Sequence, residues 1–222
     1  ALDGTHSRKQ AVQLITQDDL ADVLFDRASG DSKEPLCQGI AASPGAASGK
    51  LCLSVDAVLE VVDAGEQAIM VAMETGPADE PGMRWAAGIV TAHGGLASHA
   101  AIYSRGLGLP AVCGVEILKV EEGQIKVGET VIPEGEIISI DGVSGEIFTG
   151  TIEISDAAAP DELSTLLEWA DELRSNKVQV WANADTKEEA TEARSAGATG
   201  IGLCRTEHMF LGDRLPVIRQ LL

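Results

Sequence analysis

Two patterns of hydrophobic residues alternate along the chain, and each predicts a different kind of element. In residues 8–27 apolar side chains recur three or four positions apart, which is typical of amphipathic helices. The pattern breaks around residues 16–18, so it predicts two short helices, with Thr16 as a candidate N-cap of the second. The polar, turn-rich stretch 28–35 that follows predicts a linker.

Between residues 37 and 150 the apolar residues come in short runs separated by glycine and proline. The runs "QAIMVAM", "AAGIVTAH" and "PAVCGV" predict strands, and "ETGPADEPGM" is expected to be the loop that joins the first two. Residues 125–150 alternate apolar and polar positions between turns, which predicts a β-meander. We therefore expect a compact, β-rich domain with a few helices.

Helical spacing returns in residues 159–175, where leucines fall on one stripe. The next segments predict a β-α-β unit, with Thr186 and Glu189 as a capping box and Gly197 at the end of the helix. One such unit cannot bury both of its faces. It either docks on the rest of the chain or, as we favour, opens a larger α/β domain. The expected organisation is a helical segment with a linker (1–36), a central domain (37–150), a linker helix (151–176) and the β-α-β unit (177–222).

Charge and cysteine spacing narrow the functional classes. The 222 residues carry a formal net charge of −19, which argues against nucleic acid or an anionic membrane as a partner. None of the four cysteines belongs to a C-x-x-C pair, so they are expected to be free, mostly buried thiols in a reducing compartment rather than zinc ligands. No apolar run approaches the roughly 18 residues of a membrane span. The chain begins with alanine and has no signal-peptide pattern, so we expect a piece of a longer protein.

The candidate chemistry lies in "HGGLASHAAIYSRGLGLP", residues 93–110. An apolar strand turns here through Gly94 and Gly95 into a helix that starts near Ser98, with His99 in its first turn. Glycines let backbone N–H groups approach a ligand closely, and a helix N-terminus stabilises an anion. The pattern therefore predicts an anion site beside a histidine.

Three interpretations of His99 stay open from the residues alone. It can be a cap or a surface residue, it can bind a metal together with His93, or it can be a nucleophile toward a phosphoryl group. The metal site lacks a carboxylate or cysteine at ligand spacing. Arg105 reaches the site only if the packing of the helix turns it back.

Long motifs then resemble one family. "GGLASHAAIYSRGLGLPAVCG" resembles the phosphohistidine motif of the phosphoenolpyruvate-utilising enzymes, and "GIAASPGAASGK" resembles the start of their swivelling domain. "ANADTKEEATEARSAGATGIGLCRTEHMF" is similar to the opening of their phosphoenolpyruvate/pyruvate-binding barrel, and its ending favours the pyruvate phosphate dikinases. The resemblance covers residues 36–222. It implies an α/β chain in which a swivelling β/β/α phosphohistidine domain is flanked by linker helices and followed by the truncated start of a (β/α)8 barrel.

The resemblance also assigns roles to residues. It implies that His99 shuttles a phosphoryl group on Nε2 between a nucleotide site and a pyruvate site, with Gly94, Gly95 and Ser98 as the phosphate cradle. Arg205 matches the family's arginine that binds the phosphate of phosphoenolpyruvate, a task that suits a guanidinium fork. From the residues alone, a surface ion pair is the favoured interpretation of Arg205. The next two charged residues, Glu207 and His208, are expected to support this site or to pack.

The whole enzyme implied by the resemblance converts ATP, pyruvate and phosphate reversibly into AMP, phosphoenolpyruvate and diphosphate. It is expected to be a cytoplasmic or organellar homodimer that needs Mg²⁺, whose ligands are not expected in this chain. No nucleic acid or membrane partner is expected. This chain alone is not expected to turn over.

Two departures from the family pattern support an alternative function. Ala97 stands where the family usually has threonine, and His93 stands where relatives have arginine. A catalytically degenerate relative that acts as a non-enzymatic interaction module would tolerate both changes.

Overall fold

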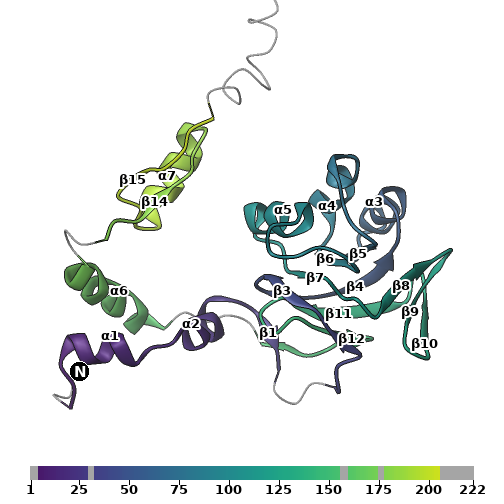
Figure 1. The fold of residues 1–222 in the computed structure, drawn as a ribbon, viewed down its shortest axis with the longest axis horizontal. Coiled ribbons are helices and arrows are strands. Elements are labelled where there is room, and N and C mark those ends of the chain that lie inside the picture. Colours follow the sequence, from purple (N-terminus) through teal and green to yellow (C-terminus); the bar gives the residue numbers. More distant parts are fainter. Residues whose placement is uncertain (1–4, 30–32, 156–159, 175–177, 206–222) are drawn as a thin grey trace, which may run out of the picture. The chain divides into compact units, whose positions relative to one another are not determined.

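The computed structural model describes residues 5–29, 33–155, 160–174 and 178–205 (Figure 1). The chain forms two compact units. One contains residues 15–160, and the other contains residues 1–14 together with 161–222. Within the described residues, none of the helices has the length and apolar content needed to cross a membrane.

The larger unit is built on an eight-stranded mixed sheet. Its strands in spatial order are β2 (Cys37–Gln38), β12 (Glu146–Thr149), β11 (Ile137–Asp141), β4 (Ala46–Cys52), β5 (Ala68–Ala72), β6 (Gly88–Thr91), β7 (Ala111–Cys113) and β3 (Ile40–Ser43). The four strands β4 to β7 run parallel, and the strands outside them pair antiparallel. The three apolar runs predicted as strands form β5, β6 and β7, so that prediction is confirmed.

Alternation along the parallel strands produces two apolar layers. On β5, Ile69 and Val71 point into one layer, and Ala68 and Met70 point into the other. The second layer is closed by helices α3 (Val55–Asp63), α4 (Glu80–Trp85) and α5 (His99–Leu107), which lie on one face of the sheet (Figure 1). The central strands are therefore buried on both faces.

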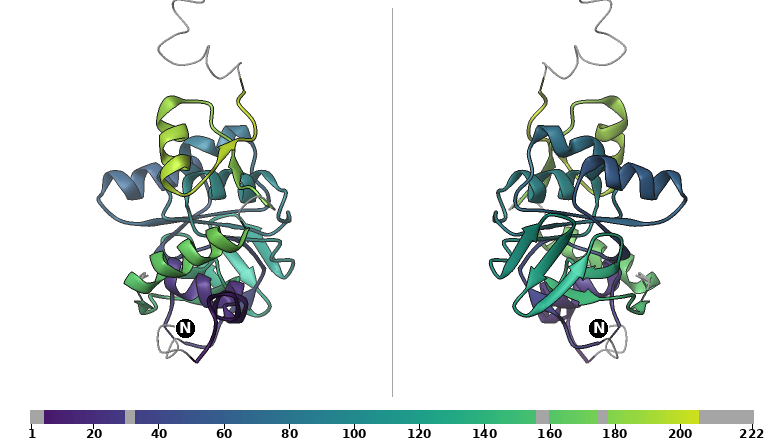
Figure 2. Two further views of the ribbon diagram at one scale, coloured as in Figure 1. Left: turned by 90° about the vertical axis from the view of Figure 1, so that its left-hand side faces the viewer. Right: turned by 90° about the vertical axis from the view of Figure 1, so that its right-hand side faces the viewer.

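A three-stranded antiparallel sheet closes the first layer. It consists of β8 (Leu118–Glu121), β9 (Gln124–Val127) and β10 (Thr130–Pro133), and it lies on the side opposite the helices (Figure 2). Its residues Leu118, Ile125 and Ile132 are buried against the large sheet. The β/β/α layering that this produces confirms the expected α/β fold class.

Two local predictions are wrong. Residues 125–150 do not form one meander, because β10 stays in the small sheet whereas β11 pairs with β4 and β12 in the large one. The turn at Glu134–Gly135 sends the chain from one sheet to the other. "ETGPADEPGM" is not a plain loop either, because it contains a 3-10 turn (Pro77–Asp79) and the start of α4. Pro81 fits there because proline suits the first turn of a helix.

The segment that precedes the strands of the large sheet lies beside the segment that follows them. Helix α2 (Gln17–Leu24) has Thr16 as its N-cap, and Thr16 and Asp19 form the full capping box, so the predicted cap is confirmed. After it, β1 (Arg27–Ala28) pairs antiparallel with β13 (Ile154–Ser155). The buried Asp141 carboxylate accepts a hydrogen bond of 2.9 Å from the Ala28 N–H and so ties this pair to β11.

The smaller unit contains a pair of packed helices and a β-α-β unit. Helix α1 (Arg8–Leu14) packs with α6 (Asp161–Arg174), and Arg8 forms an ion pair of 2.9 Å with Glu172 and lies over the ring of Trp169. Strands β14 (Trp181–Ala182) and β15 (Gly200–Ile201) are parallel and flank α7 (Lys187–Ser195), which confirms the β-α-β unit.

The caps of α7 follow the prediction in part. Thr186 accepts from the Glu189 N–H, but the Glu189 carboxylate accepts from the Asp185 N–H rather than from that of Thr186. The reciprocal half of the capping box is therefore displaced by one residue. Gly197 has a φ of +91°, which suits the residue after the helix.

All four cysteines are free, as expected. Cys37, Cys52 and Cys113 are buried, and Cys204 is partly exposed. Burial raises the pKa of the Cys37 thiol to about 11, and burial together with the Glu134 charge raises the pKa of Cys52 to about 11. Their protonated forms are therefore favoured in the folded chain.

This burial predicts selective thiol reactivity. At pH 8 only about one in a thousand molecules of a thiol with a pKa of 11 is thiolate, so Cys37 and Cys52 should react with a disulfide reagent only after unfolding, while Cys204 reacts in the folded chain. Since the unfolded chain loses these protons first, the free energy of unfolding should fall as the pH rises from about 9 towards 11. Mass mapping of the labelled thiols, with Cys204→Ser as control, checks the assignment. Equal rates for Cys37 and Cys204 in the folded chain would contradict it.

Candidate functional site

The glycine turn after β6 is held in one position by backbone hydrogen bonds. The Ala92 N–H donates to Ala72 O at 3.0 Å, and the His93 N–H donates to Met73 O at 2.8 Å. Gly94 then adopts a φ of +112°. A side chain on Gly94 would place its Cβ 2.9 Å from Ser98 Cβ, whereas one on Gly95 would meet nothing within 4 Å. Of the two predicted glycines, Gly94 is therefore required by the backbone and by space, and Gly95 borders open space.

Helix α5 begins where the sequence predicts. Ser98 is its N-cap, with Oγ accepting from the Ala101 N–H at 3.3 Å, and His99 is the first helical residue. Ala100 and Ala101 are buried against the sheet, which leaves His99 on the open side. The first turn of a helix presents N–H groups without carbonyl partners in the helix, and it carries about half a positive charge.

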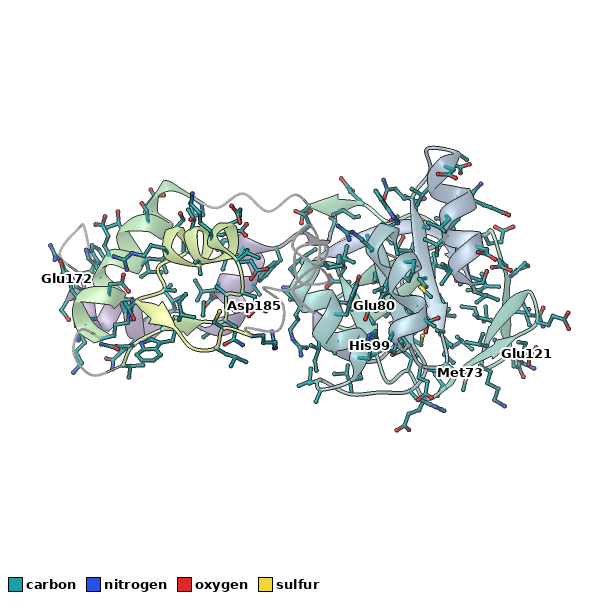
Figure 3. All side chains as sticks on the ribbon, turned by 90° about the horizontal axis from the view of Figure 1, so that it is seen from above. Met73, Glu80, His99, Glu121, Glu172 and Asp185 are labelled. Carbon is teal, nitrogen blue, oxygen red and sulfur yellow. The ribbon has the colours of Figure 1, made fainter. Side chains whose placement is uncertain are left out.

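The imidazole of His99 is held at both nitrogens and on one ring face. Nδ1 lies 3.2 Å from Thr75 Oγ1, and Nε2 lies 3.3 Å from Glu80 Oε1. The ring stacks on Tyr103 with a centroid distance of 5.8 Å, and its side chain is 29% exposed. Figure 3 shows Glu80 and His99 side by side on the large unit. The ring is thus oriented but still reachable from solvent.

Arg105 is turned back, but its guanidinium binds backbone rather than the ring. Nη1 donates to Ala42 O at 2.8 Å, and Nη2 donates to Leu96 O at 2.6 Å. Because Leu96 lies in the glycine turn, the side chain ties the last turns of α5 to the loop before the helix. Arg105 therefore fixes the shape of the loop that precedes His99.

Arg205 lies in the smaller unit, beyond the carboxyl end of β15. Its guanidinium forms an ion pair of 3.3 Å with Asp185, which follows β14, and its side chain is 44% exposed. The carboxyl ends of parallel strands are where α/β barrels gather their ligands. The surface ion pair considered from the sequence is thus present, on the side where a substrate site is expected. Glu207 and His208 lie outside the described residues.

Metal ligands do not gather in the described parts of the chain. No group of three or more His, Cys, Asp or Glu side chains that could hold a metal ion occurs among those residues. His93 and His99, considered from the sequence as metal ligands, belong to no such group there. The described residues therefore offer magnesium no ligand cluster of that kind.

Sequence reasoning missed the two residues that contact the ring nitrogens of His99. Thr75 and Glu80 come from the segment interpreted as a loop, 19 to 24 positions before the histidine. A usable signal was present, since Glu80 and Pro81 form the acidic and proline-containing first turn that commonly begins a helix. No local pattern indicates that this turn lies beside His99.

Comparison with protein families places two regions of the chain. Residues 64–145 match the model described as "PEP-utilising enzyme, mobile domain", and residues 160–221 match "PEP-utilising enzyme, PEP-binding domain". The first region contains the whole glycine turn and α5, and the second contains Arg205.

Comparison with curated proteins gives relatives that align over nearly all of the chain. "Pyruvate, phosphate dikinase 2" of Zea mays is 38% identical over 99% of this chain and 26% of its own length. "Pyruvate, phosphate dikinase" of Giardia intestinalis is 38% identical over 99% of this chain and 25% of its own length. The protein of the same name from Rickettsia typhi is 40% identical over 97% of this chain and 25% of its own length. The chain thus spans about a quarter of the length of these relatives, and it belongs to the phosphoenolpyruvate-utilising enzymes.

Proposed function

We propose that His99 is the phosphoryl carrier of a pyruvate, phosphate dikinase. The observation that carries the proposal is the position of His99: it is the first residue of a capped helix, it follows a glycine turn, and its ring is oriented yet partly exposed. The relatives named pyruvate, phosphate dikinase support the reaction class.

The local geometry suits a phosphoryl group on this ring. Neutral imidazole is a competent nucleophile toward phosphorus, and the product carries oxygens that need donors nearby. The start of α5 and the turn at Gly94 and Gly95 supply backbone N–H groups and positive potential in this otherwise acidic chain. Ser98 keeps its hydroxyl on the Ala101 N–H and so holds the first turn in place.

The whole enzyme would use this carrier between two sites. We infer that a nucleotide site charges His99 from ATP and phosphate, releasing AMP and diphosphate, and that the phosphoryl group then passes to pyruvate. Arg205 would bind the phosphate of phosphoenolpyruvate. Before the phosphate binds, Asp185 would orient the guanidinium. Mg²⁺ would act at sites whose ligands are not among the described residues. We infer a homodimer that works in the cytoplasm or an organelle.

Substitution of His99 tests the carrier role directly. The chain is mixed with a nucleotide-binding domain of a pyruvate, phosphate dikinase, phosphate, magnesium and ATP labelled at the transferred phosphoryl group. We expect an acid-labile label on the chain that falls to background in His99→Ala. His6→Gln, which changes an exposed histidine of the smaller unit, should keep the label. Label that survives His99→Ala would contradict the proposal. A folded wild-type chain that takes no label would favour the non-enzymatic module.

The two glycines of the turn give a matched pair of variants. Gly94→Ala puts a side chain on a left-handed residue and against Ser98, so it should destabilise the chain by about 1–3 kcal/mol and lower the rate of labelling. Gly95→Ala meets open space and should change stability by less than about 0.5 kcal/mol. Urea unfolding of both variants measures the difference. Equal losses of stability would show that the conformation of Gly94 is not what holds the turn.

A further inference from the structure

The Glu80 carboxylate lies on the ring nitrogen that the proposed function uses. Its Oε1 is 3.3 Å from His99 Nε2, and the two side chains are 44% and 29% exposed. Among the residues that the structure describes, His99 is the one side chain with which this carboxylate forms a hydrogen bond or ion pair. Thr75 occupies the opposite nitrogen at 3.2 Å. Glu80 therefore affects the reacting atom itself.

A carboxylate in this position determines where the imidazole proton sits. An ionised carboxylate only accepts hydrogen bonds, so Nε2 must donate and must carry the proton. Neutral His99 is then the Nε2–H tautomer, with Nδ1 accepting from the Thr75 hydroxyl. In this tautomer, as in the imidazolium, Nε2 has no free lone pair. The nucleophilic tautomer carries its proton on Nδ1, and this N–H donates a hydrogen bond to the Thr75 hydroxyl oxygen. The Glu80 carboxylate opposes this tautomer, because it would then face an Nε2 that has no proton to donate.

We propose that Glu80 is a latch on His99 that must leave Nε2 before the histidine can accept a phosphoryl group. The inference rests on the proposed phosphorylation of His99. When the carboxylate leaves and the proton moves to Nδ1, the Nε2 lone pair forms a bond to phosphorus. The bond from phosphorus to the leaving group breaks, and its electron pair departs with that group.

The contacts around Glu80 allow its side chain to move without moving the ring. Tyr103 stacks on His99, and its hydroxyl donates to the backbone oxygen of Glu80 at 3.4 Å. These two contacts link the His99 ring to the start of α4, and neither of them involves the Glu80 carboxylate. The carboxylate itself is nearly half exposed and can turn into water. A phosphoryl group on Nε2 carries negative charge and repels the carboxylate. Glu80 therefore opposes phosphorylation by charge repulsion as well as by its hydrogen bond to Nε2.

Glu80→Gln removes the charge and keeps the size of the side chain. Its amide can donate to Nε2 and so permits the Nδ1–H tautomer. ¹⁵N NMR of the full chain reads the tautomer of unphosphorylated His99, and phosphoramidate serves as a small phosphoryl donor whose P–N bond breaks to release ammonia. We expect more Nδ1–H tautomer in Glu80→Gln and a phosphorylation rate about threefold to tenfold above wild type, followed by ³¹P NMR. Glu80→Ala should change both quantities in the same direction.

Glu121→Gln is the matched control. It removes the same charge from the tip of the small sheet, away from His99 (Figure 3), and should behave as wild type. An unchanged tautomer ratio in Glu80→Gln overturns the latch whatever the rates are, and so does a rate equal to or below that of wild type. A gain in Glu121→Gln equal to that in Glu80→Gln would also overturn it, because net charge would then explain the effect. A loss of ATP-driven labelling alone would count against the carrier role of His99, and it would not change the tautomer result.

Discussion

The geometry around His99 depends on the hydrogen bond by which Ser98 caps α5. That bond fixes the residue at which the helix begins, and so it decides that the imidazole, rather than a neighbour, leaves the first turn toward solvent. An N-cap of this kind contributes about 1 kcal/mol to stability. The Ser98 side chain also fills the space that a side chain on Gly94 would need, so turn and cap require one another. Arg105 completes the arrangement by binding the carbonyl of Leu96 from the far end of the helix.

The sheet explains why residues distant in sequence meet at this ring. Strands β5 and β6 are parallel neighbours, so the segments that follow them leave the same edge of the sheet. One of these segments delivers Thr75 and Glu80, and the other delivers the glycine turn and His99. Apolar layers on both faces bury the strands and hold this edge in place. The carrier would thus work from a rigid frame.

Local patterns predicted the parts of the fold that depend on local physics. Helical periodicity and a capping threonine located α2, a glycine turn followed by a capping serine located α5, and short apolar runs located β5 to β7. The course of residues 125–150 was not predictable in this way, because alternation is the same whichever sheet a strand joins. The pairing of β11 with β4 depends on contacts about ninety residues apart.

The candidate site likewise contains residues that local patterns predicted and residues that they did not. His99, Ser98 and Gly94 lie within six residues of one another and share one motif, so the sequence located them together. Thr75 and Glu80 join them only through the order of the strands and through the start of α4. The two sets of residues also differ in what they do at the site. The motif residues build the place for an anion, and the two missed residues determine the state of the ring.

The identity of the phosphorylated atom is the most direct test of the carrier role of His99. In a phosphorylated chain labelled with ¹⁵N, coupling between ³¹P and a ring nitrogen identifies the bonded atom. We predict phosphorus on Nε2 of His99, the nitrogen turned away from Thr75. Phosphorus on Nδ1, or on any residue other than His99, would contradict it.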